Sequence, residues 1–265
     1  MMNLTYETML AEEREPGILL VTFNRPELRN AFNTQMGLDL SDLFLDKLPG
    51  ADRMRVVIVT GAGDKAFSAG GDLKQRLGMT TKEWLDQHHI FRRAFDAVLE
   101  CPIPVIAAVN GAAFGGGCEL ALGCDFIHAA RGAKFALSEA KLGIMPGGGG
   151  TVNLPRVVGP ARAKEIATSA RPFTAEQAED WGMVNGVHEP DALLPYVFDL
   201  ARDIAANAPL SVRQIMKSIE YNMRVDLRTA IAFQLECYDQ LIATEDRHEG
   251  VAAFNERRKP DFKGR

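Results

Sequence analysis

The run of glycines near the middle of the chain constrains the fold more than any other part of the sequence. An apolar segment, residues 105–109, is followed by Gly111, by three consecutive glycines at 115–117 and then by a helical stretch. This order predicts a buried strand that leads through a glycine turn into a helix. Glycine permits positive φ and close approach of a ligand, and the first turn of a helix has N–H groups without partners. This central glycine corner (residues 111–119) is therefore suited to bind a negatively charged oxygen.

Two carboxylates accompany this corner. Glu119 comes three residues after Gly116, at the start of the predicted helix, and Glu139 follows the next strand-like run, residues 134–137. Either glutamate taken alone is more typical of a helix-start acid or a surface charge. Together with the glycine corner, they predict two acids that flank a polarised carbonyl group.

Two further glycine segments lie on either side of the central corner in the sequence. In the early glycine corner (residues 66–74), Gly70 and Gly71 turn the chain and Asp72 can cap the following helix. The glycine loop (residues 143–151) leads into a helix from about Val152, and it is either a simple helix start or a direct ligand contact. Residues 78–99 have helical spacing, which predicts either a wall over the site or an ordinary amphipathic helix packed on the core.

Strands and helices alternate over the first 190 residues. Apolar runs predict strands at residues 17–23, 56–60, 105–109, 134–137 and 183–188. Periodic segments predict helices at residues 33–48, 161–169 and 174–181. This alternation is typical of an α/β protein with a parallel sheet. From Asp191 onward the pattern is entirely helical, which predicts one domain over residues 1–190 and a helical region over residues 191–265.

Length and charge limit the possible partners. A chain of 265 residues with 46% hydrophobic residues can bury a large core. The formal net charge is −5 and there is no basic stripe, which argues against a nucleic-acid-binding protein. A small ligand that carries phosphate remains compatible, because local basic clusters such as residues 257–259 are enough to bind it.

Cysteine and histidine spacing indicates neither a disulfide framework nor a metal site. The four cysteines form no CxxC pair, and the five histidines have no metal-ligand spacing. These features predict a reduced, intracellular protein without a metal. The first 17 residues lack an apolar signal core, and no apolar run is long enough to span a bilayer. We therefore expect a cytoplasmic location and no membrane association.

Several segments resemble one known family. They are AFSAGGDLK at 66–74, PVIAAVNGAAFGGGCELALGCD at 104–125, SEAKLGIMPGGGGT at 138–151 and EGVAAFNERRKPDFKG at 249–264. In sequence and in order they are similar to the crotonase superfamily, the enoyl-CoA hydratase and isomerase family. The resemblance implies an α/β fold in which a spiral of ββα turns is followed by a C-terminal helical oligomerisation region. It also implies an acyl-CoA substrate, no cofactor beyond the coenzyme A of that substrate, and a homotrimer or homohexamer.

The resemblance assigns roles to the corners and to the two acids. The backbone N–H groups of Gly71 and Gly116 would form the oxyanion hole for the thioester carbonyl. Glu139 would be the principal acid/base and Glu119 would position the water. The implied reaction adds water across a 2-enoyl-CoA to give the 3-hydroxyacyl-CoA, so the chain would be a hydro-lyase of the kind found in fatty acid metabolism.

The resemblance also implies contacts with the substrate. Met145 and Pro146 are candidates for the acyl pocket, and Arg25 and Lys263 are further basic candidates for the phosphates. The residues implied for binding the acyl-CoA are Ala69, Gly71, Asp72, Leu73, Lys74, Gly116, Arg29, Phe254 and Arg257.

Within the family, the sequence looks most like the branch that contains methylglutaconyl-CoA hydratase. Some members of that branch bind RNA through a lysine-rich early helix, but residues 27–46 contain no lysine, which argues against a nucleic-acid partner. Two alternative activities stay open, an enoyl-CoA isomerase and a branched-chain, methylglutaconyl-type hydratase. A binding protein with a vestigial site is the alternative from a different class.

Overall fold

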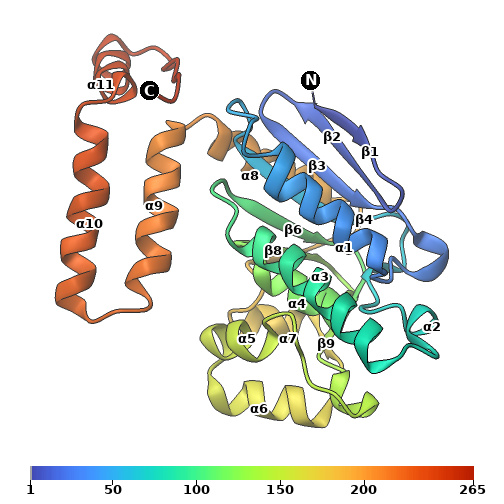
Figure 1. The fold of residues 1–265 in the computed structure, drawn as a ribbon. Helices are drawn as coiled ribbons and strands as arrows, with labels where there is room; N and C mark the ends of the chain where they lie inside the picture. The colour runs from blue at the N-terminus through green and yellow to red at the C-terminus, as the bar shows by residue number, and fades with distance from the viewer. Residues whose placement is uncertain (1) are drawn as a thin grey trace.

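The protein contains two β-sheets flanked by helices (Figure 1), and a computed structural model describes residues 2–265. The larger sheet has the strand order β1-β2-β3-β4-β6-β8-β11. Strands β1 to β3 are antiparallel, and the pairs from β3 to β11 are parallel. The bounds of these strands are β1 Asn3–Thr5, β2 Met9–Glu15, β3 Ile18–Phe23, β4 Val56–Gly61, β6 Val105–Val109, β8 Phe126–Ala130 and β11 Gly186–His188.

The central strands were predicted because they are continuously apolar. Every residue of β4 and of β6 is buried, as expected for parallel strands that are covered on both faces. Strand β2 was not predicted, because its sequence MLAEERE contains three glutamates. Its side chains nevertheless alternate between buried and more exposed positions, so only one face packs on the core.

The smaller sheet creates the spiral. Its strand order is β10-β9-β7-β5, with β5 Ala66–Ser68, β7 Ala112–Phe114, β9 Lys134–Ala136 and β10 Phe173–Thr174. The chain runs from β4 to β5, from β6 to β7 and from β8 to β9, moving each time from the larger sheet to the smaller one. A helical segment follows each pair: α2 (Leu73–Arg76), α4 (Gly116–Gly123) and the 3₁₀ helix η3 (Glu139–Leu142). The predicted α/β fold of repeated ββα turns is therefore confirmed.

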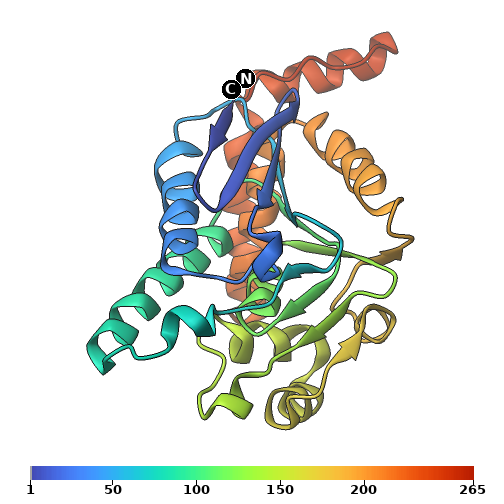
Figure 2. The same ribbon diagram turned by 90° about the vertical axis from the view of Figure 1, so that its right-hand side faces the viewer.

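Helices cover both faces of the larger sheet (Figures 1 and 2). On one face lie α1 (Thr34–Ser41) and α3 (Thr81–Leu99), which pack together where Gly37 meets Ile90 and Phe91. On the other face, α8 (Leu193–Ala205) buries Leu193, Val197 and Ala201 against the alternate side chains of the strands. The remaining helical segments of the core are η1 Pro26–Leu28, η2 Asp42–Lys47, α5 Gly150–Val158, α6 Pro160–Ser169 and α7 Ala175–Asp180.

The C-terminal helices extend away from this core. Helices α9 (Pro209–Asn222) and α10 (Leu227–Ile242) form a hairpin that projects to one side, and α11 (Glu245–Glu256) follows at its end (Figure 1). Helix α8 lies beyond the expected boundary at residue 190 but packs on the larger sheet. The division of the chain into two regions stays a prediction.

Asn30 joins the end of β3 to the early glycine corner. It is fully buried and its φ is 53°. Its Oδ1 accepts from the N–H of Arg25 at 3.0 Å, and its Nδ2 donates to the carbonyls of Ala62 at 3.1 Å and Ala66 at 2.8 Å. Its own carbonyl accepts from the Ser68 hydroxyl at 2.8 Å. These bonds hold the segment that precedes Gly70 and Gly71.

We expect Asn30→Ala to lower the free energy of unfolding by about 3–5 kcal/mol. The change removes the side-chain partner of one buried and two partly buried backbone groups and places alanine in the left-handed region. Urea denaturation at one protein concentration measures the difference. Asn207→Ala is the control, because Asn207 is exposed and its side chain donates only to the Asp203 carbonyl. A loss below about 1 kcal/mol for Asn30→Ala would contradict this account.

Candidate active site

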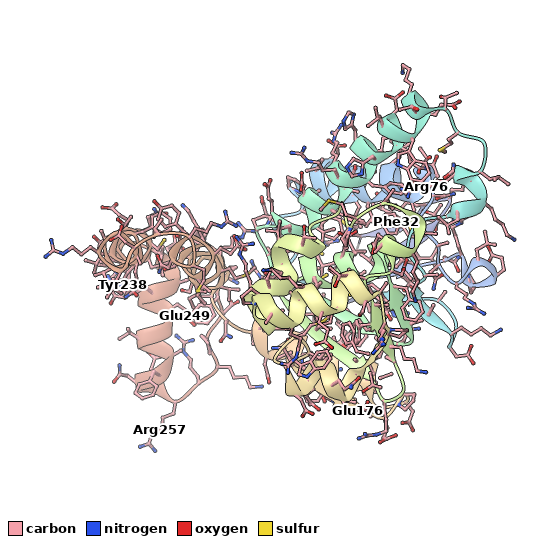
Figure 3. All side chains as sticks on the ribbon, turned by 90° about the horizontal axis from the view of Figure 1, so that it is seen from below. Phe32, Arg76, Glu176, Tyr238, Glu249 and Arg257 are labelled. Atoms are coloured by element: carbon pink, nitrogen blue, oxygen red, sulfur yellow. The ribbon has the colours of Figure 1, made fainter. Side chains whose placement is uncertain are left out.

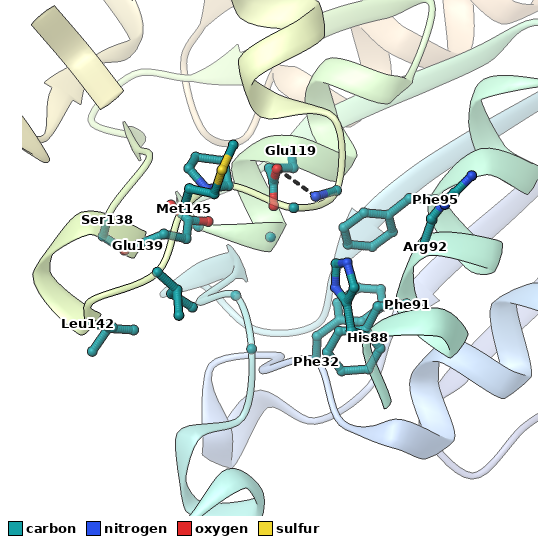
Figure 4. A pocket seen from close by; sticks show the side chains of 18 of the residues that line it. Phe32, His88, Phe91, Arg92, Phe95, Glu119, Ser138, Glu139, Leu142 and Met145 are labelled. Carbon is teal, nitrogen blue, oxygen red and sulfur yellow. Dashed lines mark hydrogen bonds between the residues drawn. The ribbon is translucent and has the colours of Figure 1, made fainter. Parts of the chain in front are cut away.

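A cavity of about 670 Å³ lies between the two glycine corners, α3 and the glycine loop. Figure 4 shows Phe32, His88, Phe91 and Phe95 on one side of it and Glu119, Glu139, Leu142 and Met145 on the other. Its two walls therefore differ, because one is mainly aromatic and the other carries the two carboxylates.

The two glycine corners touch through their backbones. A Cβ atom on Gly70, whose φ is +86°, would lie 2.5 Å from the Phe114 carbonyl oxygen and 3.2 Å from the Gly116 nitrogen. Only glycine permits this approach. The contact brings Gly71 and Gly116 to the same end of the cavity, although they are far apart in sequence.

The N–H groups of Gly71 and Gly116 are available to a ligand for different reasons. Gly71 and Phe32 form a parallel β-bridge, but both of its hydrogen bonds are made by the residues next to Gly71. The Phe32 N–H donates to the Gly70 carbonyl, and the Asp72 N–H donates to the Phe32 carbonyl. The N–H of Gly71 itself therefore points away from Phe32. Gly116 is the first residue of α4, so its N–H has no intrahelical acceptor.

Glu119 is held by the glycine loop. The residue lies in the first turn of α4 and is 4% exposed. Its Oε1 accepts hydrogen bonds from the N–H groups of Gly148 and Gly150, each at 2.8 Å, and Figure 4 draws one of these bonds. The loop thus starts α5 and also orients a carboxylate from another turn of the spiral, a role that the sequence analysis missed.

Glu139 faces the same cavity with one oxygen unsatisfied. It begins η3 and is 8% exposed. Its Oε2 is buried and has no hydrogen-bond partner among residues 2–265. A buried carboxylate oxygen without a partner is costly, so this atom is suited to bind a polar group of a ligand or a water molecule.

The surroundings raise the pKa of both acids. The pKa of Glu119 is raised to about 7, mainly by burial and also by the nearby charge of Glu139, while the N–H groups of Gly150 and Gly148 oppose the shift. Burial also raises the pKa of Glu139, and the positive charge of Arg76 opposes that shift. Near neutral pH the pair can therefore hold one proton and one negative charge.

Aromatic side chains form the opposite wall. Phe32 makes edge-to-face contacts with Phe91 and Phe95 of α3, at ring-centroid distances of 5.5 and 5.2 Å. A Cβ atom on Gly148 would overlap the Phe95 ring. Helix α3 is therefore both the predicted wall of the site and an amphipathic helix packed on the core.

The structure brings most of the predicted core residues to this cavity. Those that line it are Ala69, Gly71, Leu73, Gly116, Glu119, Glu139, Met145 and Pro146. Asp72 lies beneath the corner instead. It caps α2 by accepting from the N–H groups of Lys74 and Gln75, and it forms an ion pair with Arg25 at 3.0 Å.

Other predicted contacts lie outside the cavity. Lys74 and Arg29 are not among its lining residues, although the Arg29 carbonyl accepts from the N–H of Ala69 at 3.0 Å. Phe254 is 84% exposed on α11, and Arg257 ends that helix far from Arg76 and the cavity of the same chain (Figure 3). The roles of these residues stay predictions.

The cavity also contains Arg76, which the sequence analysis did not single out. Its position four residues after the cap Asp72, on a four-residue helix, is a signal too weak to identify it.

Within the described residues, no helix is both long and apolar enough to cross a membrane. Residues 2–265 likewise contain no group of three or more His, Cys, Asp or Glu side chains that could hold a metal ion.

The ββα spiral is the fold of crotonase-type enzymes. Residues 13–265 match the enoyl-CoA hydratase/isomerase family, and the chain belongs to this family.

Known proteins of this kind align with nearly the whole chain. The mitochondrial methylglutaconyl-CoA hydratase of Mus musculus is 38% identical over 96% of this chain and 82% of its own length. The short-chain-enoyl-CoA hydratase of Clostridium acetobutylicum is also 38% identical, over 96% of this chain and 97% of its own. The crystal structure of an enoyl-CoA hydratase from Bacillus anthracis superposes with a TM-score of 0.95 at 38% identity, covering 98% of this chain and 100% of that one. The predicted family is thus confirmed.

We expect Glu119→Gln to stabilise the protein at pH 8 but hardly at pH 5. The pKa of Glu119 is raised from 4.5 to about 7 in the folded state. The stability that the wild type has with Glu119 protonated is therefore fully present below pH 4.5 and is lost as the pH rises through 7, because the folded protein must then bury a negative charge. Glutamine keeps an oxygen for the two glycine N–H groups and removes the charge. The expected gain at pH 8 is on the order of 3 kcal/mol, measured by urea denaturation at both pH values.

Glu165→Gln is the control for this experiment, because Glu165 is an exposed glutamate on α6. It should produce no gain that depends on pH. An equal loss of stability for Glu119→Gln at pH 5 and pH 8 would mean that the bonds from Gly148 and Gly150 to the carboxylate outweigh its burial.

Proposed function

We propose that the protein is an enoyl-CoA hydratase that adds water across the 2,3-double bond of an enoyl-CoA thioester. One observation carries this proposal: a single cavity contains a carboxylate held by backbone N–H groups, Glu119, and a second carboxylate with an unsatisfied buried oxygen, Glu139. The N–H groups of Gly71 and Gly116 lie at the same cavity. Together these groups supply what hydration of a thioester-activated double bond requires.

The two corners would polarise the thioester. When water attacks the β-carbon, negative charge develops on the thioester oxygen as an enolate. The N–H groups of Gly71 and Gly116 are fixed by the contact between the corners, so they would bind this oxygen without reorganisation. A donor of this kind is worth about 10²–10³-fold in rate in other enzymes.

The two glutamates would handle the water and its protons. Glu119, whose Oε1 is engaged by the glycine loop, would hold the water with Oε2. Glu139 would act as the principal acid/base, taking a proton from the water and delivering one to the α-carbon. The raised pKa values of both acids suit this exchange near neutral pH.

The presence of both acids favours hydration over double-bond migration, because an isomerase needs only one acid/base to move a proton. The open cavity between the acids and the corners argues against a vestigial site. Sequence similarity does not choose the acyl group, because a short-chain hydratase and a methylglutaconyl-CoA hydratase are equally similar to this chain, each at 38% identity.

We also propose a homotrimer or homohexamer built through the C-terminal helices. The hairpin of α9 and α10 exposes large apolar side chains that its own core does not cover, namely Ile215, Ile219, Ile231, Leu235 and Tyr238. An apolar surface of this kind favours association with another copy. If Phe254 and Arg257 bind coenzyme A as expected, a neighbouring copy would have to bring them to the cavity, since they lie outside it in their own chain.

We expect Glu119→Gln and Glu139→Gln each to lower kcat for crotonyl-CoA hydration by about 10²–10⁴-fold. Each change removes a group that accepts or donates a proton while keeping its shape. The loss of enoyl-thioester absorbance measures the rate, and calorimetry with butyryl-CoA verifies that each variant still binds. Exposed Glu165→Gln serves as the matched control. An active protein whose two variants keep full activity would rule out the paired-acid mechanism, and inactivity of the wild type toward every enoyl-CoA would rule out the hydratase.

We expect Leu235→Asp to weaken the assembly. Leu235 is 54% exposed on α10, so a charge there should disrupt an interface without disturbing the core of the chain. Light scattering after size-exclusion chromatography measures the mass. Leu77→Asp is the control, because Leu77 is 88% exposed but lies beside α2, away from the hairpin. A wild-type monomer at micromolar concentration would overturn the proposed oligomer.

A further inference from the structure

Arg76 is a cation that lines the cavity without a carboxylate partner. The side chain is half-buried at the end of α2, and no ion pair is formed by it among residues 2–265. Burial lowers the pKa of its guanidinium, and the nearby charge of Glu139 opposes that shift. A positive charge in such a position costs free energy unless a ligand compensates it.

The guanidinium is held in one orientation by other side chains. Its Nε donates to the Oε1 of Gln87 at 2.8 Å, and it lies over the Trp84 ring at 4.4 Å from the ring centroid. Gln87 is 3% exposed and donates in turn to Thr34 Oγ1 and Gln75 Oε1, each at 2.9 Å. This network engages only Nε, so the Nη1 and Nη2 donors remain available to a ligand. Such a preorganised planar fork suits a carboxylate.

Arg76 lies beside the part of the cavity where the acyl group would react. A Cβ atom on Gly71 would be 3.3 Å from both Cζ and Nη1 of Arg76. The charge of Arg76 also acts on Glu139. A substrate whose thioester oxygen meets the Gly71 N–H and whose double bond meets Glu139 has its acyl group there. The phosphates of coenzyme A are separated from this point by the whole pantetheine arm.

The other basic groups at the cavity do not duplicate Arg76. Arg92 is exposed and forms an ion pair with Asp96 at 3.4 Å. Burial lowers the pKa of His88, and the charges of His89, Arg76 and Arg92 lower it further, so that this side chain is neutral near pH 7. Arg76 is therefore the group at this wall that can neutralise an anion of the ligand.

We propose that Arg76 selects enoyl-CoA substrates whose acyl chain ends in a carboxylate. The inference rests on the proposed hydratase function and specifies its substrate class. A terminal carboxylate would accept two hydrogen bonds from Nη1 and Nη2 and would compensate the half-buried charge of Arg76. A hydrocarbon chain of equal length would leave those donors without partners. Arg76 would also shield the substrate carboxylate from the negative charge of Glu119 and Glu139.

The test compares 4-carboxybut-2-enoyl-CoA with hex-2-enoyl-CoA, which has an ethyl group in place of the carboxylate. A second pair, 5-carboxypent-2-enoyl-CoA and hept-2-enoyl-CoA, examines a longer chain. Of the two carboxylated substrates, we take the one with the higher kcat/KM. We expect its kcat/KM with the wild type to exceed that of its neutral partner by at least about 100-fold. Arg76→Met should lower that preference about 100-fold or more, and Arg76→Lys should retain part of it because it keeps the charge but loses the fork.

Arg93→Met is the matched control, because Arg93 is an exposed arginine on α3 that does not line the cavity. Its preference should equal that of wild type. The decisive quantity is the kcat/KM of the carboxylated substrate divided by the kcat/KM of its neutral partner. A role of Arg76 in setting the pKa of Glu139, or in binding coenzyme A phosphates, would change both substrates by the same factor.

Binding provides a readout that does not depend on turnover. Calorimetry with the saturated analogues glutaryl-CoA and hexanoyl-CoA should show the same preference and the same loss in Arg76→Met. If wild type hydrates no enoyl-CoA but still binds glutaryl-CoA more tightly through Arg76, the hydratase proposal fails and the carboxylate site stands. A wild-type preference for the neutral substrate, or an Arg76→Met variant with an unchanged ratio, would overturn the inference.

Discussion

The contact between the two glycine corners is the constraint on which the rest of the site depends. Gly70 meets the Phe114 carbonyl and the Gly116 nitrogen so closely that any side chain at Gly70 would prevent the approach. Each corner follows a short strand of the smaller sheet, and those strands, β5 and β7, are parallel neighbours. Successive turns of the spiral therefore repeat the same path and bring two backbone corners together at one end of the cavity.

The same repetition explains how the acids are positioned. Glu119 lies in the first turn of the helix after β7, and Glu139 begins the 3₁₀ helix after the next strand of that sheet, β9. Each acid thus comes from the same structural position in consecutive turns. Burial then raises the pKa of both, so the protein retains a pair of carboxyl groups that reduces its stability at neutral pH. Such a cost is expected where a proton must be exchanged with a substrate.

Much of this arrangement was predictable from sequence because it depends on local chemistry. The central strands were recognisable from continuous apolar runs, and Asp72 and Thr174 were recognisable as caps because their side chains bond the first turn of the next helix. The family and its ββα fold followed from several motifs in order. Strand β2 was missed because its sequence contains three glutamates, one of which, Glu13, is buried in the structure. The second role of the glycine loop was missed because its acceptor lies about 30 residues earlier.

The sequence by itself determined the order of strands and helices, the glycines that allow the corners to turn, and the two acids that follow them. Only the tertiary structure decided that Gly148 and Gly150 orient Glu119, that one oxygen of Glu139 is left without a partner, and that Gln87 holds Arg76 beside Gly71. The physical reason is that caps, turns and apolar periodicity act between near neighbours in the chain. The burial of a side chain, the shift of its pKa and the orientation of a charged group such as Arg76 depend on segments that meet only after the spiral has closed.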